Sequence, residues 1–234
     1  MAVAVSATGT SSHGASVTAF DYTGITVGAG DNALVVILCL QAGSNPGNPV
    51  CHWDSAGTNQ AMLRVGVQLG GGGADTVSLH GLVNPTPGNL NLHITWTAAA
   101  IPDVCALSFT GVLTSGGNAA AFINFASNNL AQFGLALNVT VTNQPNSIVV
   151  NGAIGNANSY SSPSGTQIFN DTNFTGTTSA AGQWAAPSAT PYSFLWTASA
   201  STATAQAGME VVPAPAGGGA AAPTDVIGVG ATEW

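Results

Sequence analysis

Charged residues are nearly absent from this sequence. Among 234 residues, Asp, Glu, Lys and Arg together make up 4%, whereas a soluble domain usually carries about 25%. Lysine is missing and Arg64 is the single arginine. A nucleic-acid-binding protein needs a basic patch to neutralise phosphates, and anionic lipid attracts clustered Lys and Arg. The composition therefore argues against a nucleic-acid partner and against docking on a membrane.

Long hydrophobic runs are also missing. The apolar run ALVVILCL at 33–40 has the length of a strand, and a membrane-spanning helix needs roughly 20 such residues. The opening MAVAVSATGTSS contains no basic region and no apolar signal core. We therefore expect no export signal, so the protein either stays where it is made or leaves by a route such as cell lysis.

Cysteine is scarce and odd in number. Cys39 and Cys105 fall inside apolar strands, where cysteine usually behaves as a small hydrophobic residue, and Cys51 is the third. A Cys39–Cys105 bridge stays open, because sequence does not establish its geometry. No CxxC or HxxxH spacing occurs, so we expect no metal site and no cofactor.

The sequence does contain a clear two-residue periodicity. Four apolar residues alternate with polar neighbours between 89 and 96: Leu90, Leu92, Ile94 and Trp96. Such alternation predicts a strand with one buried face and one hydrated face. The turn NPTPGN precedes it, and the segment TAAAIPD interrupts the pattern before apolar residues resume at 104–109. We predict strand, turn, strand, short loop and strand.

The same pattern recurs along the chain. The run 33–40 predicts a central strand buried on both sides, and further strands are predicted near 135–141, 147–154, 192–196 and 205–211. Residues 113–134 permit a short helix or an edge loop, and 156–191 resemble a long loop with spaced aromatic residues. We predict an all-β fold of about 9–11 strands, an antiparallel β-sandwich or jelly roll with long loops and an extended C-terminal tail.

Residues 1–213 are predicted to form this domain, and 214–234 differ in composition. The segment PAPAGGGAAAP is typical of a linker. The segment VIGVGATEW follows it and holds apolar residues that a free tail has no reason to keep. We predict that these residues form a docking arm: Val226, Ile227, Val229 and Trp234.

Catalytic signatures are not found. The histidines at 13, 52, 80 and 93 have no acid or nucleophile at a meaningful spacing, and we interpret them as surface or hydrogen-bonded strand residues. The acids are scattered, mostly at turns, where Asp bonds the local backbone. The hydrolase motif GxSxG is absent, and no Lys-Ser/Thr follows the glycines at 70–73. We therefore expect a protein that is not an enzyme.

Two tryptophans suggest a second type of site. Trp53 lies between His52 and Asp54 at the start of a loop, and Trp184 lies in the long polar segment. An exposed indole beside polar groups can stack on a sugar ring. These four residues form a candidate glycan platform. The alternative, that each tryptophan plugs one end of the sandwich, stays open.

The order of motifs resembles a known family. In sequence order the motifs are NALVVILCL, WDSAGTNQAMLRVG, LHGLVNPTPGNLNLHITWT, CALSFTGV, NSIVVNGAIGNA and SFLWTASASTATAQAGMEVVP. This order is similar to that of phage-encoded and bacterial β-sandwich proteins, over about residues 32–213. The family's double glycine in the first hairpin is Ala56-Gly57 here, and the tail lies outside the pattern.

The resemblance implies a virion-associated or surface protein without a catalytic site. We therefore expect a structural protein of a phage virion, either a capsid decoration (cement) subunit or a fibre subunit. Its expected partners are copies of itself, a major capsid protein or a tail protein, and its expected location is the virion. The alternative is a glycan-binding module, such as an adhesin or a receptor-binding fibre tip, on an extracellular surface with carbohydrate as its ligand.

Overall fold

A computed structural model describes residues 1–12, 15–70, 74–130, 136–155, 159–172, 178–199 and 204–215. Strands account for 63% of the structure and helix for 2%, and the sheets are antiparallel. The predicted all-β sandwich class is therefore confirmed. No helix in the described part of the chain is long and apolar enough to cross a membrane.

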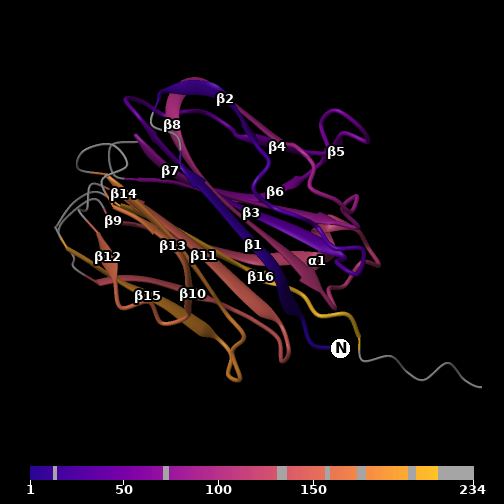
Figure 1. Ribbon diagram of the computed structural model, residues 1–234. Coiled ribbons are helices and arrows are strands. Elements are labelled where there is room, and N and C mark those ends of the chain that lie inside the picture. The colour runs from indigo at the N-terminus through magenta and orange to yellow at the C-terminus, as the bar shows by residue number, and fades with distance from the viewer. Residues whose placement is uncertain are drawn as a thin grey trace, which may run out of the picture.

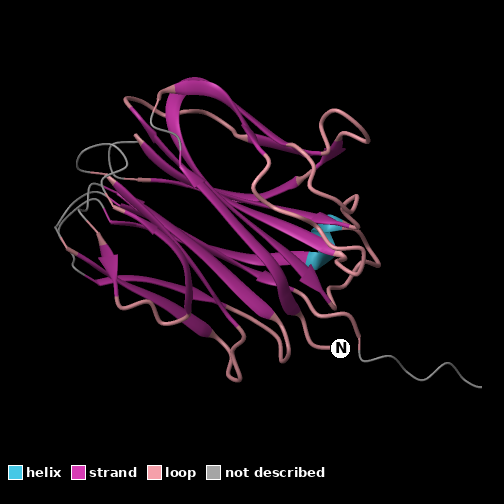
Figure 2. Cartoon of the chain, viewed as in Figure 1, coloured by secondary structure: helices cyan, strands magenta, loops and turns pink. Residues whose placement is uncertain are grey.

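The N-terminal half of the chain forms one eight-stranded sheet (Figures 1 and 2). Its central path runs β5-β4-β8-β3-β7-β6, and β1 and β2 also pair with β8. The strands of this first sheet are β1 (Ala4–Ser12), β2 (Val17–Tyr22), β3 (Ala33–Ala42), β4 (Val50–Trp53), β5 (Gln60–Ala61), β6 (Leu63–Leu69), β7 (Asp75–Val83) and β8 (Leu92–Thr110).

The C-terminal half forms two smaller sheets below the first one in Figure 1. A short helix, α1 (Asn118–Ala121), leads into them. The middle sheet has the order β13-β14-β11-β16-β9, with β13 (Thr166–Asp171), β14 (Ser179–Ala185), β11 (Ile148–Gly155), β16 (Thr204–Val211) and β9 (Phe122–Leu130). The small sheet has the order β10-β15-β12, with β10 (Ala136–Val141), β15 (Tyr192–Ala198) and β12 (Tyr160–Ser161).

Strand β3 lies between two hydrophobic cores. Val35 and Ile37 face the middle sheet. Their neighbours Val36 and Leu38 face the opposite core, which lies inside the first sheet because this sheet curls and its strands β2, β4 and β8 cover that side. Every residue from 33 to 40 is therefore buried. This explains the continuous apolar run, and the predicted central strand is confirmed.

Strand β8 corrects the predicted loop at TAAAIPD. The chain stays extended from Leu92 to Thr110 as one 19-residue strand. Its first part pairs with β2 and β4, and its second part pairs with β1 and β3. The register against β2 shifts between Val17 and Ala19, opposite this segment. The broken pattern thus marks a bulge where β8 exchanges neighbours, because bulges bend a strand without ending it.

The middle sheet is covered on both faces, which the sequence did not reveal. Along β11, Val150 and Ile154 face the first sheet, whereas Val149 and Ala153 face the small sheet. All eight residues of β11 and all eight of β16 are buried. The long polar segment 156–191 supplies β12, β13 and β14 in its described part, so the prediction of a long loop there was wrong.

Asn151 is the centre of a hydrogen-bond network between the middle and small sheets. The Oδ1 atom of Asn151 accepts hydrogen bonds from Trp196 Nε1 at 2.9 Å and from Gln206 Nε2 at 3.3 Å. Its Nδ2 atom donates to the carbonyl of Ala207 at 2.8 Å. Such pairing offsets the cost of removing amides from water. Cys39, Cys51 and Cys105 are free and buried, so the bridge left open between Cys39 and Cys105 does not form.

Three buried titratable groups make stability depend on pH. Burial raises the pKa of Asp103 to about 8, with a further contribution from the charge on Asp171, and burial raises the pKa of Asp75 to about 6. Burial, together with the charge on Arg64, lowers the pKa of His80 to about 3. An acid with a raised folded-state pKa stabilises the fold at low pH and loses that contribution as pH rises.

We expect the free energy of unfolding to fall as pH rises from 7 to 8. In this window the contribution of Asp103 is being lost, whereas the loss from Asp75 is nearly complete and the contribution of His80 is mostly present, because the pH lies above the folded pKa of Asp75 and the unfolded pKa of His80. The slope is at most about 1.4 kcal/mol per pH unit. Urea unfolding at several pH values should show the slope in the native chain and in Asp54→Asn, and a much smaller slope in Asp103→Asn, where only the residual contributions of Asp75 and His80 remain. An unchanged slope in Asp103→Asn would contradict this assignment.

Close packing of glycine against aromatic rings gives a second prediction. A Cβ atom at Gly81 on β7 would lie 2.3 Å from the Phe122 ring, whereas one at Gly30 would meet nothing within 4 Å. Overpacking of this kind typically costs about 1–3 kcal/mol. Gly81→Ala should lower the urea midpoint clearly, and Gly30→Ala should leave it nearly unchanged. Equal midpoints in the two variants would show that the sheets separate easily at this point.

Candidate functional site

The two ends of the described chain meet at one edge of the molecule. The amine of Met1 donates to the carbonyl of Ala214 at 2.8 Å, and the amide of Ala214 donates to the carbonyl of Gly111 at 2.8 Å. Val112 and Pro213 form an isolated antiparallel bridge. These bonds hold the last described residues, up to position 215, against the body.

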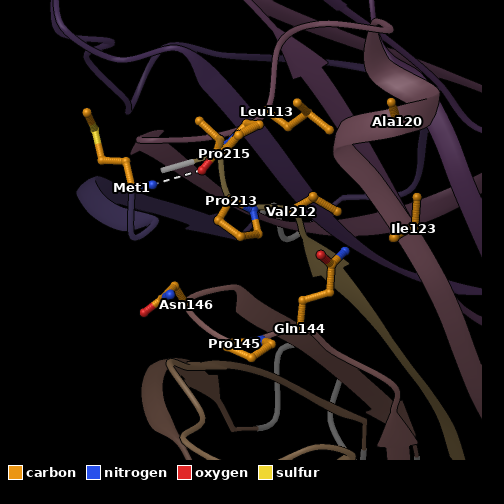
Figure 3. Close-up of a pocket in the computed structure, with 11 residues that line it drawn as sticks. Met1, Leu113, Ala120, Ile123, Gln144, Pro145, Asn146, Val212, Pro213 and Pro215 are labelled. Carbon is orange, nitrogen blue, oxygen red and sulfur yellow. Dashed lines mark hydrogen bonds between the residues drawn. The ribbon is translucent and has the colours of Figure 1, made fainter. Parts of the chain in front are cut away.

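A groove of about 490 Å³ opens beside these bonds (Figure 3). We call it the terminal groove. Its walls come from the chain start, the approach to α1 and β9, the loop after β10 and the segment after β16. The lining residues are Met1, Leu113, Ala120, Ile123, Gln144, Pro145, Asn146, Val212, Pro213, Ala214 and Pro215.

The terminal groove offers apolar surface, and its lining side chains are not ionisable; the ionisable α-amine of Met1 is taken up by its hydrogen bond to the Ala214 carbonyl. Near its base, the carboxylate of Glu210 is fully buried and accepts hydrogen bonds from the Gln144 amide and from Asn124 Nδ2, both at 2.7 Å. Both oxygens of that carboxylate are therefore already hydrogen-bonded, and one of them holds the loop after β10 in place. Acid–base or nucleophilic chemistry needs a titratable group facing the ligand. The groove is suited to binding an apolar segment instead.

The candidate glycan platform is not assembled. Trp53 has no exposed surface, and its Nε1 atom donates to the Thr86 carbonyl at 2.8 Å. This burial corrects the expectation of an exposed ring, because the inward face of β4 packs into the core that the first sheet encloses. His52 points outward on the same strand, and Asp54 accepts hydrogen bonds from Thr58 within its own loop.

Trp184 lies on a different sheet from Trp53. It is half-buried on β14, packs at the edge of the core between the first and middle sheets, and lines a hollow of about 310 Å³ with residues of β1 and β13. The structure therefore does not bring Trp184 together with the other three residues of the predicted platform. The predicted arm residues Val226, Ile227, Val229 and Trp234 lie outside the described residues.

One histidine, His93, does have an acidic neighbour, contrary to the sequence-based expectation. His93 Nδ1 lies 2.7 Å from Asp21 Oδ1, because β2 pairs with β8. His80, by contrast, is fully buried and bonds the Ser78 hydroxyl at 2.8 Å. Asp21, Asp75 and Asp103 lie on strands instead of turns. No local sequence spacing could reveal the Asp21–His93 contact, since only the sheet pairing produces it.

Comparison with protein-family models and with curated protein sequences finds no match for this chain. The function must therefore be argued from the residues and the geometry of the terminal groove.

Proposed function

We propose that this protein is a non-enzymatic structural subunit of a phage virion, either a capsid decoration subunit or a fibre subunit. In this proposal, copies assemble when the tail of one subunit binds the terminal groove of a neighbour. The observation that carries the proposal is the position of the groove. Apolar surface with uncharged side chains opens where the chain leaves its folded body, and that chain continues into an apolar segment.

The composition of the tail suits exchange between neighbours. Residues 216–224 are Gly, Ala, Pro and Thr, which are typical of a linker, and Val226, Ile227, Val229 and Trp234 follow. Fully extended, a segment of this length spans roughly 60 Å, at about 3.3–3.6 Å per residue. That reach exceeds the distance across a small groove, so the arm can span to an adjacent subunit.

The distribution of charge also supports an assembled state. Four acidic side chains are buried, namely Asp31, Asp75, Asp103 and Glu210. The outer surface of the described body is therefore even poorer in charge than the composition indicates. Uncharged surface is less costly to remove from water than ionised surface, and charged residues are depleted at the cores of interfaces. The resemblance in motif order to phage-encoded β-sandwich proteins favours a virion as the assembly.

The proposal can be tested by truncation and by peptide binding. We expect the full-length chain to form a stable oligomer in light scattering on a sizing column, and a 1–215 truncation to be monomeric with an unchanged circular dichroism spectrum. A fluorescent peptide of residues 225–234 should bind the truncation saturably. Several such contacts acting together would give the assembly its avidity.

Matched variants locate the binding surface. Leu113→Asn and Ile123→Asn add polarity to the groove and should weaken peptide binding at least tenfold. Leu195→Asn makes a similar change at an exposed apolar residue of the small sheet and should leave binding unchanged. A truncation that stays oligomeric and binds no peptide would contradict the tail-and-groove assembly.

A further inference from the structure

Three polar residues form a row across the outer face of the first sheet. Asp21 on β2 pairs with His93 on β8, and His93 pairs with His52 on β4. The flanking residues of the two histidines point inward and are buried, namely Cys51 and Trp53 on β4 and Leu92 and Ile94 on β8. Because side chains alternate along a strand, both imidazoles lie on the solvent side of the sheet, directly opposite each other.

Each imidazole is held by its Nδ1 atom. His93 Nδ1 donates to Asp21 Oδ1 at 2.7 Å, and His52 Nδ1 donates to Asn59 Oδ1 at 2.9 Å. A carboxylate and an amide oxygen are both acceptors, so each ring nitrogen at this position carries the proton. The neutral imidazole then keeps its lone pair on Nε2, because the bond made by one nitrogen selects the role of the other.

The oxygen next to His93 is itself fixed in place. Asn91 Nδ2 donates to Asp21 Oδ1 at 2.9 Å and to the Ser55 hydroxyl at 2.8 Å. Hydrogen bonds from Asn91 and His93 lower the pKa of Asp21, which keeps it ionised. A carboxylate bonded to the far nitrogen of a histidine is the arrangement that orients metal-binding imidazoles and raises their basicity.

We propose that the Nε2 atoms of His52 and His93 together bind one divalent transition-metal ion, with water in the remaining positions. Directly opposed residues on antiparallel strands have Cβ atoms about 4.5–5.5 Å apart, within reach of two imidazoles around one ion. Imidazole suits Cu²⁺, Ni²⁺ and Zn²⁺, whereas Mg²⁺ and Ca²⁺ prefer oxygen ligands. The described residues hold no metal-binding group of three or more His, Cys, Asp or Glu, so the site has two protein ligands and open positions.

This site differs from the sequence-based expectation of no metal, which rested on ligand spacing along the chain. His52 and His93 are far apart in sequence and become neighbours only when β4 pairs with β8. The inference does not depend on the proposed assembly, because the row lies on the outer face of the first sheet and shares no residue with the terminal groove.

Calorimetric titration of the full-length chain with Cu²⁺, Ni²⁺, Zn²⁺ and Mg²⁺ at neutral pH tests the site. We expect one ion per chain, tightest for Cu²⁺ in accordance with the general order for nitrogen ligands, and no Mg²⁺ binding. His52→Gln and His93→Gln should each weaken binding at least tenfold, and His13→Gln should not. Undiminished binding in the double variant His52→Gln, His93→Gln would overturn the proposal, as would the lack of saturable Cu²⁺ binding by the native chain.

Nitrogen NMR of the histidine side chains separates ligation from a general effect on the fold. Before metal is added, His52 and His93 should both show a proton on Nδ1. Zn²⁺ should shift the Nε2 resonances of these two residues and leave His80 unchanged. Asp21→Ala should weaken metal binding about 10–100-fold and mix the protonation pattern of His93. Zn²⁺ shifts confined to other residues would contradict the assignment.

Discussion

The requirement that β3 be covered on both faces organises the molecule. The strand is apolar at every position from 33 to 40, so neither face tolerates water. The first sheet meets the requirement on one side by curling until β2, β4 and β8 close over Leu34, Val36 and Leu38. The middle sheet meets it on the other side, where β11 packs against β3 around Val35 and Ile37 and β16 packs against the neighbouring strand β7. The 19-residue strand β8 makes this possible, because its bulge lets the first part pair with β2 and β4 and the second part pair with β1 and β3.

The middle sheet that covers β3 is itself apolar on its other face, so that face must also be buried. The outer face of β11 carries Val149, Asn151 and Ala153, and the small sheet buries them. Asn151 is tolerated there because its Oδ1 atom accepts hydrogen bonds from Trp196, Gln183 and Gln206 and its Nδ2 atom donates to the backbone. Asp103 makes fewer hydrogen bonds, since one of its carboxylate oxygens has no hydrogen-bond partner. Burial without a full set of hydrogen bonds raises the pKa of this carboxyl group.

The surface features follow from the same architecture. Strand pairing places Asp21, His93 and His52 in one row, and the junction of the two chain halves leaves the terminal groove beside the last described residues. Neither feature is a motif in the sequence. The side chains that line the groove are uncharged because the segments that meet there are rich in Pro, Ala and branched aliphatic residues. The histidine row is ordered because oxygen acceptors from β2 and from the turn before β5 hold each ring.

The amino-acid sequence alone determined the class of fold, the central strand at 33–40 and the alternating strands at 90–96 and 192–196, because two-residue periodicity reports local burial. It also indicated that Cys39 and Cys105 behave as small hydrophobic residues, whereas the tertiary structure decided that no bridge joins them. The three-layer packing, the continuity of β8 through TAAAIPD and the strands within 156–191 depended on which surfaces face each other, so only the tertiary structure revealed them. The same holds for the sites. Trp53 looks exposed beside His52 and Asp54 in sequence, yet its side of β4 faces a core, whereas His52 meets His93 and Asp21 through pairings that no local spacing encodes.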